Sequence, residues 1–187
     1  MKHRWLYGVL AVAVVFGIAT YFGSTRTEQP GRAFALIDSN GARVTDRSFH
    51  GHWLIVYFGF THCTDVCPVH MLKLSKALEV LGAQAAQVRV AFITVDPERD
   101  SAQVLHSYLR GFGPKFTGLT GTQPQIDAAE QTFRAYAEKR PAAADGSYAM
   151  NHSSSFYVLD PNGHFRRQIS AEAGIPDLAA TLRSAMQ

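Results

Sequence analysis

Two cysteines are the residues in this sequence whose type and spacing most directly suggest chemistry. Cys63 and Cys67 are the only cysteines among the 187 residues, and three residues separate them. Thiolate sulfur is a ligand for soft metal ions such as Cu(I), and it is also the nucleophile that attacks disulfides. Adding one imidazole to two thiolates gives a three-ligand site that suits copper. The pair therefore indicates either a metal site or a redox centre.

The segment around the pair lies where an apolar run changes to helical spacing. Cysteines four apart in a first helical turn face the same way, close enough to chelate one ion or to form a disulfide. Unpaired backbone N–H groups and the helix dipole at such a position favour thiolate over thiol. The sequence therefore predicts two reactive sulfurs at a helix N-terminus, with Pro68 in the first turn.

The spacing of the cysteines also separates protein classes. A thioredoxin-type redox centre has two residues between its cysteines, whereas three stand between Cys63 and Cys67. The wider loop is better suited to a metal ion held between the sulfurs. A single structural disulfide in an oxidising compartment is the alternative, and a framework of several disulfides is excluded by the cysteine count.

The elements that must position the pair follow from hydrophobic patterning. Runs at 53–60 and 88–95 are apolar on both faces, as in buried strands of a mixed or parallel sheet. Strands alternate with helices along the chain, which predicts an α/β fold with a central mixed sheet. The other expected elements are hairpins at 33–45 and 154–169, a weak strand at 115–119, a loop at 138–148, and helices at 69–81, 101–111, 122–136 and 176–186.

Charge is distributed unevenly along the chain. The formal net charge is +3, but Lys2, Arg4 and Arg26 flank one apolar stretch, and from residue 27 onward 15 Lys and Arg balance 15 Asp and Glu. This neutral body has no basic stripe, so nucleic-acid binding is excluded. Neither a Gly-rich phosphate loop nor a paired-carboxylate motif is present, which argues against rapid catalysis on a small molecule.

The apolar stretch, residues 5–22, has 18 residues without an acidic or basic side chain. As a helix it would span roughly 27 Å, close to the thickness of a bilayer core. We expect an N-terminal transmembrane anchor at 1–24, a tether at 25–31 and one domain at 32–187. The basic residues ahead of the stretch predict a cytoplasmic N-terminus and a periplasmic domain on a bacterial inner membrane. A cleaved signal peptide is the alternative.

Three segments resemble, in order, the signatures of the Sco/SenC family of copper-binding, membrane-anchored proteins. They are FGFTHCTDVCP, AFITVDPERD and NHSSSFYVLDPNG. The resemblance implies a thioredoxin-like fold with an N-terminal β-hairpin extension. It also implies copper, as Cu(I), Cu(II) or both, held by Cys63, Cys67 and His152. The residue before the histidine is often Asp in this family, and here it is Asn151, which puts the copper affinity in question.

The same resemblance implies a copper chaperone that delivers copper to, or matures, the binuclear copper site of cytochrome c oxidase. Its partners would be the copper-site subunit of the oxidase or another cuproprotein, and an upstream copper donor. Two alternatives use cysteine chemistry instead, with Cys63 and Cys67 as a catalytic redox pair in the first and Cys67 as the reactive thiol in the second. One is a periplasmic thiol-disulfide oxidoreductase acting on a cuproprotein. The other is a thiol peroxidase, suggested by Thr64 three residues before Cys67 and weakened by Phe60, where a proline is expected.

Other polar residues near the pair have simpler interpretations. His62 and His70 could reach a metal ion, but exposed loop and helix positions explain them more simply. Met71 has the helical spacing of a core residue. The acidic loop from Asp96 to Asp100 is either a family feature or a solvated turn, and Ser101 after it is expected to cap the next helix.

Overall fold

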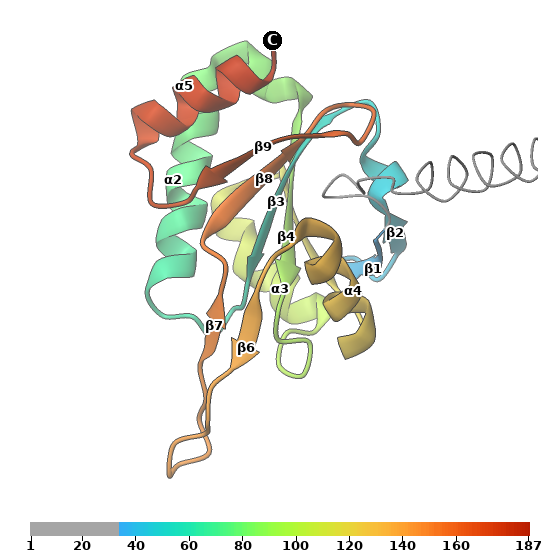
Figure 1. Ribbon diagram of the computed structural model, residues 1–187, viewed down its shortest axis with the longest axis vertical. Coiled ribbons are helices and arrows are strands. Elements are labelled where there is room, and N and C mark those ends of the chain that lie inside the picture. The colour runs from blue at the N-terminus through green and yellow to red at the C-terminus, as the bar shows by residue number, and fades with distance from the viewer. Residues whose placement is uncertain (1–33) are drawn as a thin grey trace, which may run out of the picture.

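The computed structural model describes residues 34–187, which form a central sheet with helices on both faces (Figure 1). The seven strands have the order β2-β1-β5-β4-β3-β8-β9. Their bounds are β1 (Ala35–Asp38), β2 (Arg43–Thr45), β3 (Trp53–Gly59), β4 (Val88–Thr94), β5 (Phe116–Thr120), β8 (Ser155–Leu159) and β9 (Phe165–Ser170). The main helices are α2 (Val66–Leu81), α3 (Ala102–Leu109), α4 (Gln123–Phe133) and α5 (Ile175–Ala185). Short 3₁₀ turns lie at Asp46–Phe49, Gly82–Gln87 and Arg110–Phe112.

Strand β3 lies in the interior of the sheet, between β4 and β8. It runs parallel to β4 and antiparallel to β8, and all seven of its residues are buried. Branched and aromatic side chains on both faces explain this position, because a central strand covered by helices must be apolar on both sides. The strands predicted at 53–60 and 88–95 are confirmed. The mixed α/β sheet is confirmed with them.

Alternating side chains of β3 show which helix covers which face. Tyr57 packs against Phe92 of β4 and contacts His70 of α2. The next residue, Phe58, points to the other face and packs against Phe133 of α4. Successive strand residues face opposite sides, so α2 and α4 cover opposite faces of the sheet. Helix α5 packs beside α2.

Two further predictions concern the ends of elements. Ser101 caps α3 by accepting a hydrogen bond from the Val104 N–H, as expected. Helix α2 ends at Leu81, just before Gly82, as expected. However, Val69 and Leu72, two apolar residues of the spacing that predicted α2, lie on its exposed side. Helical spacing therefore located α2 correctly but overstated how much of its surface is buried.

A second, two-stranded sheet projects from the body as a hairpin (Figure 1). Strands β6 (Ala137–Lys139) and β7 (Met150–His152) pair antiparallel, with His152 opposite Ala137. The loop predicted at 138–148 is therefore correct for the hairpin tip and wrong at its first two residues, which belong to β6. Each strand has only three residues, too few to give an alternating pattern in the sequence.

The predicted N-terminal hairpin forms, and its first strand β1 also pairs with β5. The anchor predicted at 1–24 and the tether predicted at 25–31 lie outside the described residues. Within residues 34–187, none of the helices is long and apolar enough to span a bilayer.

Candidate metal centre

Three candidate ligand atoms come together at one edge of the sheet. The sulfurs of Cys63 and Cys67 and a ring nitrogen of His152 all lie within 4.8 Å of one another. Cys63 lies in the loop after β3, Cys67 in the first turn of α2, and His152 at the end of β7. Because β3 and β8 are antiparallel, the end of β3 and the segment entering β8 meet at the same edge. The sheet topology therefore joins residues that are 85 positions apart.

The two sulfurs occupy different environments. Cys67 is fully buried, whereas Cys63 is partly exposed, in the wall of a cleft of about 360 Å³ that His152 also lines. The Cys67 N–H donates a hydrogen bond to the Cys63 Sγ at 3.4 Å, so the turn at the helix start orients both side chains. The structure contains both residues as free thiols.

For Cys67 the expected preference for thiolate is wrong. Burial raises the pKa of its thiol to about 12, because a charged sulfur loses its hydration inside the core. A thiol at this position stays protonated near neutral pH until a cation replaces the proton.

The imidazole of His152 is presented as a metal ligand. Its Nε2 lies 3.2 Å from the Cys67 Sγ, and its Nδ1 lies 3.2 Å from the carbonyl oxygen of Ser153. When Nδ1–H donates to that carbonyl, Nε2 is left with its lone pair toward the sulfurs. Burial lowers the pKa of His152, which favours the neutral form that binds metals. The ring packs edge-on against Tyr57 and Phe60.

The neighbouring Asn151 does not supply this orientation. Its side chain is exposed on β7, where the residue pairs with Glu138. The backbone carbonyl of Ser153 is the group within reach of the imidazole Nδ1. A carbonyl acceptor from the chain itself is available whatever residue stands at 151, so the departure from Asp leaves the orientation of the ring intact.

His70 is not the exposed helix residue that the sequence suggested. It is 1% exposed, with its Nδ1 2.8 Å from the Tyr57 hydroxyl and its Nε2 3.0 Å from the Glu172 carboxylate. The Tyr57 hydroxyl also lies 3.8 Å from the Cys67 Sγ. A chain of polar groups therefore runs from the buried sulfur to Glu172, which is 65% exposed. Spacing along α2 placed His70 on the helix but gave no information about this partner.

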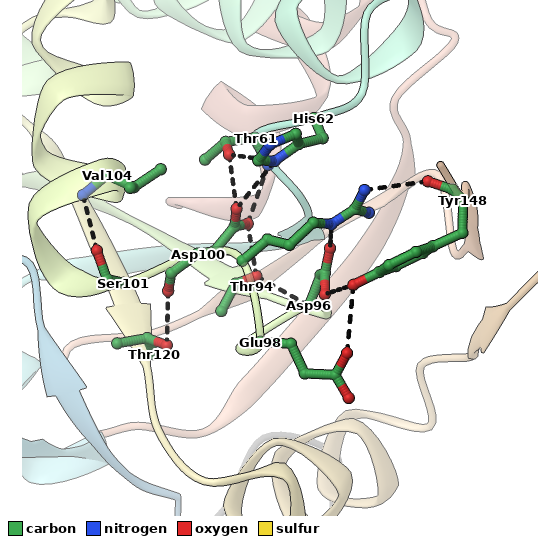
Figure 2. Close-up of polar contacts among 11 residues, drawn as sticks. Thr61, His62, Thr94, Asp96, Glu98, Asp100, Ser101, Val104, Thr120 and Tyr148 are labelled. Carbon is green, nitrogen blue, oxygen red and sulfur yellow. Dashed lines mark hydrogen bonds and ion pairs between the residues drawn. The ribbon is translucent and has the colours of Figure 1, made fainter. Parts of the chain in front are cut away.

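The acidic loop after β4 is not a solvated turn. Asp96 and Asp100 are 3% and 0% exposed. The Asp100 carboxylate accepts hydrogen bonds from the N–H and hydroxyl of Thr61 and from the hydroxyl of Thr94 (Figure 2). Thr61 begins the cysteine loop, so Asp100 anchors that loop to β4.

Two residues near the cysteines remain outside the cluster of three. Met71 is fully buried and belongs to the core, as expected. His62 is 51% exposed, with its Nδ1 3.8 Å from Asp100, and it is not part of the group whose ligand atoms converge.

Comparisons with known proteins agree with this geometry. Residues 23–187 match the family model described as SCO1/SenC. The SCO2 homologue of Danio rerio is 38% identical over 156 residues, which are 82% of this chain and 56% of that protein. The chain therefore spans little more than half of this curated relative.

Solved structures cover a similar part of the chain. Arabidopsis thaliana ScoI with copper bound has a TM-score of 0.78 and 35% identity, over 83% of this chain and 96% of that one. Bradyrhizobium japonicum ScoI with copper bound has a TM-score of 0.75 and 37% identity, over 84% and 99%.

A third structure, of BsSco, described with a disulfide switch and as a member of the Sco family of cytochrome c oxidase assembly proteins, has a TM-score of 0.67. It is 25% identical, over 87% of this chain and 96% of that one. The fold is thioredoxin-like in the manner of these structures, and the chain belongs to the SCO1/SenC family.

Proposed function

We propose that this chain is a copper chaperone that binds one copper ion through Cys63, Cys67 and His152. The observation that supports it best is the convergence of two sulfurs and one imidazole within 4.8 Å. Thiolates select Cu(I), and imidazole accepts either oxidation state of copper. The copper-bound relatives have the same fold over most of this chain.

The site suits a metal ion that is later transferred to another protein. Three protein ligands leave copper with room for an incoming ligand from another protein, and Cys63 and His152 line an open cleft. We infer that the recipient is the binuclear copper site of cytochrome c oxidase, as expected from the family resemblance. An upstream copper donor would load the same site from the cleft.

Titration of the reduced protein with Cu(I) under anaerobic conditions tests this proposal. One equivalent should bind tightly, and Cys63→Ser and Cys67→Ser should abolish that binding. His152→Ala should weaken it, since two thiolates remain. His62→Ala is the matched control, because it removes an exposed histidine next to Cys63, and it should bind like the parent. Tight one-to-one binding kept by both Cys63→Ser and His152→Ala would exclude the proposed site.

Delivery is tested separately from binding. The copper-loaded protein is mixed with the apo copper-site domain of the oxidase subunit, and copper and free thiols are measured in both proteins. Loss of one copper from this chain with an equal gain in the recipient supports a chaperone. Gain of thiols in an oxidised recipient without metal movement supports the other candidate.

That other candidate is a thiol-disulfide oxidoreductase acting on the cysteines of a cuproprotein. Contact between the Cys67 N–H and the Cys63 sulfur keeps the two residues close, and a relative is described with a disulfide switch. This activity would persist in His152→Ala, whereas a three-ligand copper site would be impaired. A thiol peroxidase is disfavoured, because the buried Cys67 thiol with its raised pKa is a poor nucleophile.

We further infer that the domain lies in the periplasm, anchored by the apolar stretch at 5–22. Protease treatment of intact cells and spheroplasts tests this. The domain should be cleaved in spheroplasts and not in intact cells. Without protease treatment, the protein should sediment with membranes. Recovery of a soluble, shortened protein would instead indicate a cleaved signal peptide.

A further inference from the structure

The hairpin that ends in His152 has its own attachment to the body. It is not part of the seven-stranded sheet, and side chains on the tip side of its paired strands join it to the loop after β4. Five residues form this attachment, which we call the Arg99 cluster. They are Asp96, Glu98 and Arg99 from the loop after β4, and Lys139 and Tyr148 from the hairpin. Figure 2 shows Tyr148 reaching toward the acidic loop.

Arg99 and Tyr148 make the central contact of the cluster. The Arg99 guanidinium carbon lies 3.6 Å from the centre of the Tyr148 ring, and its Nη1 donates a hydrogen bond to the Tyr148 carbonyl oxygen at 3.1 Å. The Tyr148 hydroxyl donates to the Asp96 carboxylate at 2.9 Å. Asp96 also accepts a hydrogen bond from the Arg99 Nε. The Tyr148 ring, hydroxyl and carbonyl are thus all held by the same loop.

The first strand of the hairpin, β6, joins the same contact through Lys139. The Lys139 Nζ lies 4.0 Å from the centre of the Tyr148 ring and 2.7 Å from the Glu98 carboxylate. A cation over an aromatic face is attracted by the ring, and more strongly where water is excluded. Two cations on one ring, together with the hydrogen bonds of Tyr148, attach the tip side of the hairpin strands to the loop.

Two routes connect the cluster to the imidazole. Along the chain, Tyr148 is four residues before His152, and Lys139 pairs with Met150 while Ala137 pairs with His152. Through space, the Arg99 guanidinium carbon lies 5.8 Å from the centre of the Phe60 ring, and that ring packs edge-on against His152 at 5.9 Å. The backbone and the packing therefore both transmit the position of Arg99 to His152.

We propose that Arg99 and Tyr148 are positioning residues that hold His152 over the two sulfurs. Their loss would free the hairpin and withdraw the imidazole, leaving the two cysteines in place. The inference rests on the proposed copper site. It deepens that proposal by treating the two parts of the site separately. The cysteine loop is anchored through Asp100 and Thr61, whereas His152 is held by the Arg99 cluster.

The size of the effect follows from the role of supporting residues in metal sites. Loss of a residue that orients a ligand typically costs 10- to 100-fold in metal affinity. We expect Tyr148→Ala to weaken Cu(I) binding by about tenfold, less than His152→Ala does. Tyr148→Phe keeps the ring between the two cations and loses only the hydroxyl contacts to Asp96 and Glu98, so its effect should be smaller.

The decisive test is a double-mutant cycle with the full chain. Cu(I) affinity is measured by competition with a chelator for the parent, Tyr148→Ala, His152→Ala and the double variant. If Tyr148 acts through His152, Tyr148→Ala weakens binding in the parent and has no effect in the His152→Ala background. Tyr136→Ala is the matched control, since Tyr136 precedes β6 and is 54% exposed; it should leave the affinity unchanged.

Hydrogen exchange of the metal-free protein gives a second measurement. The amides of β7 should exchange faster in Tyr148→Ala than in the parent or in Tyr136→Ala, with the amides of α2 unaffected. Unchanged exchange in β7, or an equal loss of affinity in both backgrounds of the cycle, would overturn the inference. Absence of copper binding by the parent would instead refute the proposed function, and the exchange result would still show whether Tyr148 holds the His152 strand.

Discussion

The carboxylate of Asp100 accepts hydrogen bonds from both the backbone N–H and the hydroxyl of Thr61, at 2.9 and 2.6 Å. Asp100 has no exposure to solvent, and Thr61 stands two residues before Cys63. A third donor, the Thr94 hydroxyl, lies 2.7 Å away. The negative charge is thus buried but satisfied by three donors, and it fixes the start of the loop that carries the first sulfur.

Replacing this carboxylate should be costly. Asp100→Asn puts an amide NH₂ among groups that donate hydrogen bonds, so at least one donor loses its acceptor. We expect a loss of about 2 to 3 kcal/mol in the free energy of unfolding, the usual size for an unsatisfied buried polar group. Urea denaturation measures it. Asp127→Asn, on the exposed side of α4, is the control, and equal stability of the two variants would contradict the role of Asp100.

The buried His70 should make the stability of the metal-free protein depend on pH. Burial lowers its pKa, partly opposed by Glu172 and aided by Lys73, so the folded state binds a proton less readily than the unfolded chain. The contribution of His70 to the free energy of unfolding is therefore fully present above about pH 6.5, the pKa of histidine in the unfolded chain. It decreases as the pH falls below that value. His152 has a pKa shifted in the same direction, so it adds to this loss.

Urea denaturation at pH 7.5 and 5.5 tests the His70 contribution. The free energy of unfolding of the parent should decrease between these values, and His70→Gln should show a smaller decrease. A His70→Gln protein with the same pH dependence as the parent would show that His70 does not contribute.

Glu130 should show the opposite pH dependence. Burial, with a smaller effect of Asp127, raises the pKa of Glu130 to about 7. The folded state then favours the protonated acid, so its stabilising contribution is present at low pH and is lost as pH rises through about 7. We expect Glu130→Gln to stabilise the protein by on the order of 1 kcal/mol at pH 8, reduced by solvent screening, and to have little effect at pH 4. Denaturation midpoints at both pH values measure this, and equal shifts at both would refute it.

Gly118 lies where β5 passes under α3. A Cβ added there would be 2.6 Å from the Cβ of Leu105, which is fully buried. Gly118→Ala should therefore destabilise the protein by about 1 to 3 kcal/mol through overpacking. Gly111→Ala is the control, because a Cβ at Gly111 meets nothing within 4 Å. Thermal unfolding of both variants measures the difference, and an unchanged midpoint for Gly118→Ala would exclude the clash.

Local patterns predicted much of the fold and two of the three candidate ligands. The strands β3 and β4 were identifiable because long runs apolar on both faces admit few other structures. Cys63 and Cys67 were found by residue type and spacing alone. His152 came from the family resemblance, because no local pattern connects it with residues 85 positions earlier.

What the sequence did not reveal depends on long-range contacts. Asp100 reaches Thr61 across 39 positions, and Arg99 reaches Tyr148 across 49. An acidic loop looks solvated unless its distant donors are known. The same reason explains His70, whose carboxylate partner Glu172 is 102 positions away, and the pKa of Cys67, which is raised chiefly by burial in the folded core.

The long separation between Cys67 and His152 also has a consequence for folding. A metal ion that bridges these residues would close a loop of 85 residues, so it would act as a reversible cross-link between the start of α2 and the segment before β8. An ion that binds the folded site and not the unfolded chain stabilises the domain, and a link that persists on unfolding also lowers the entropy of the unfolded chain. A partner that takes the ion would therefore also remove this cross-link, so release of copper from the proposed site would lower the stability of the domain.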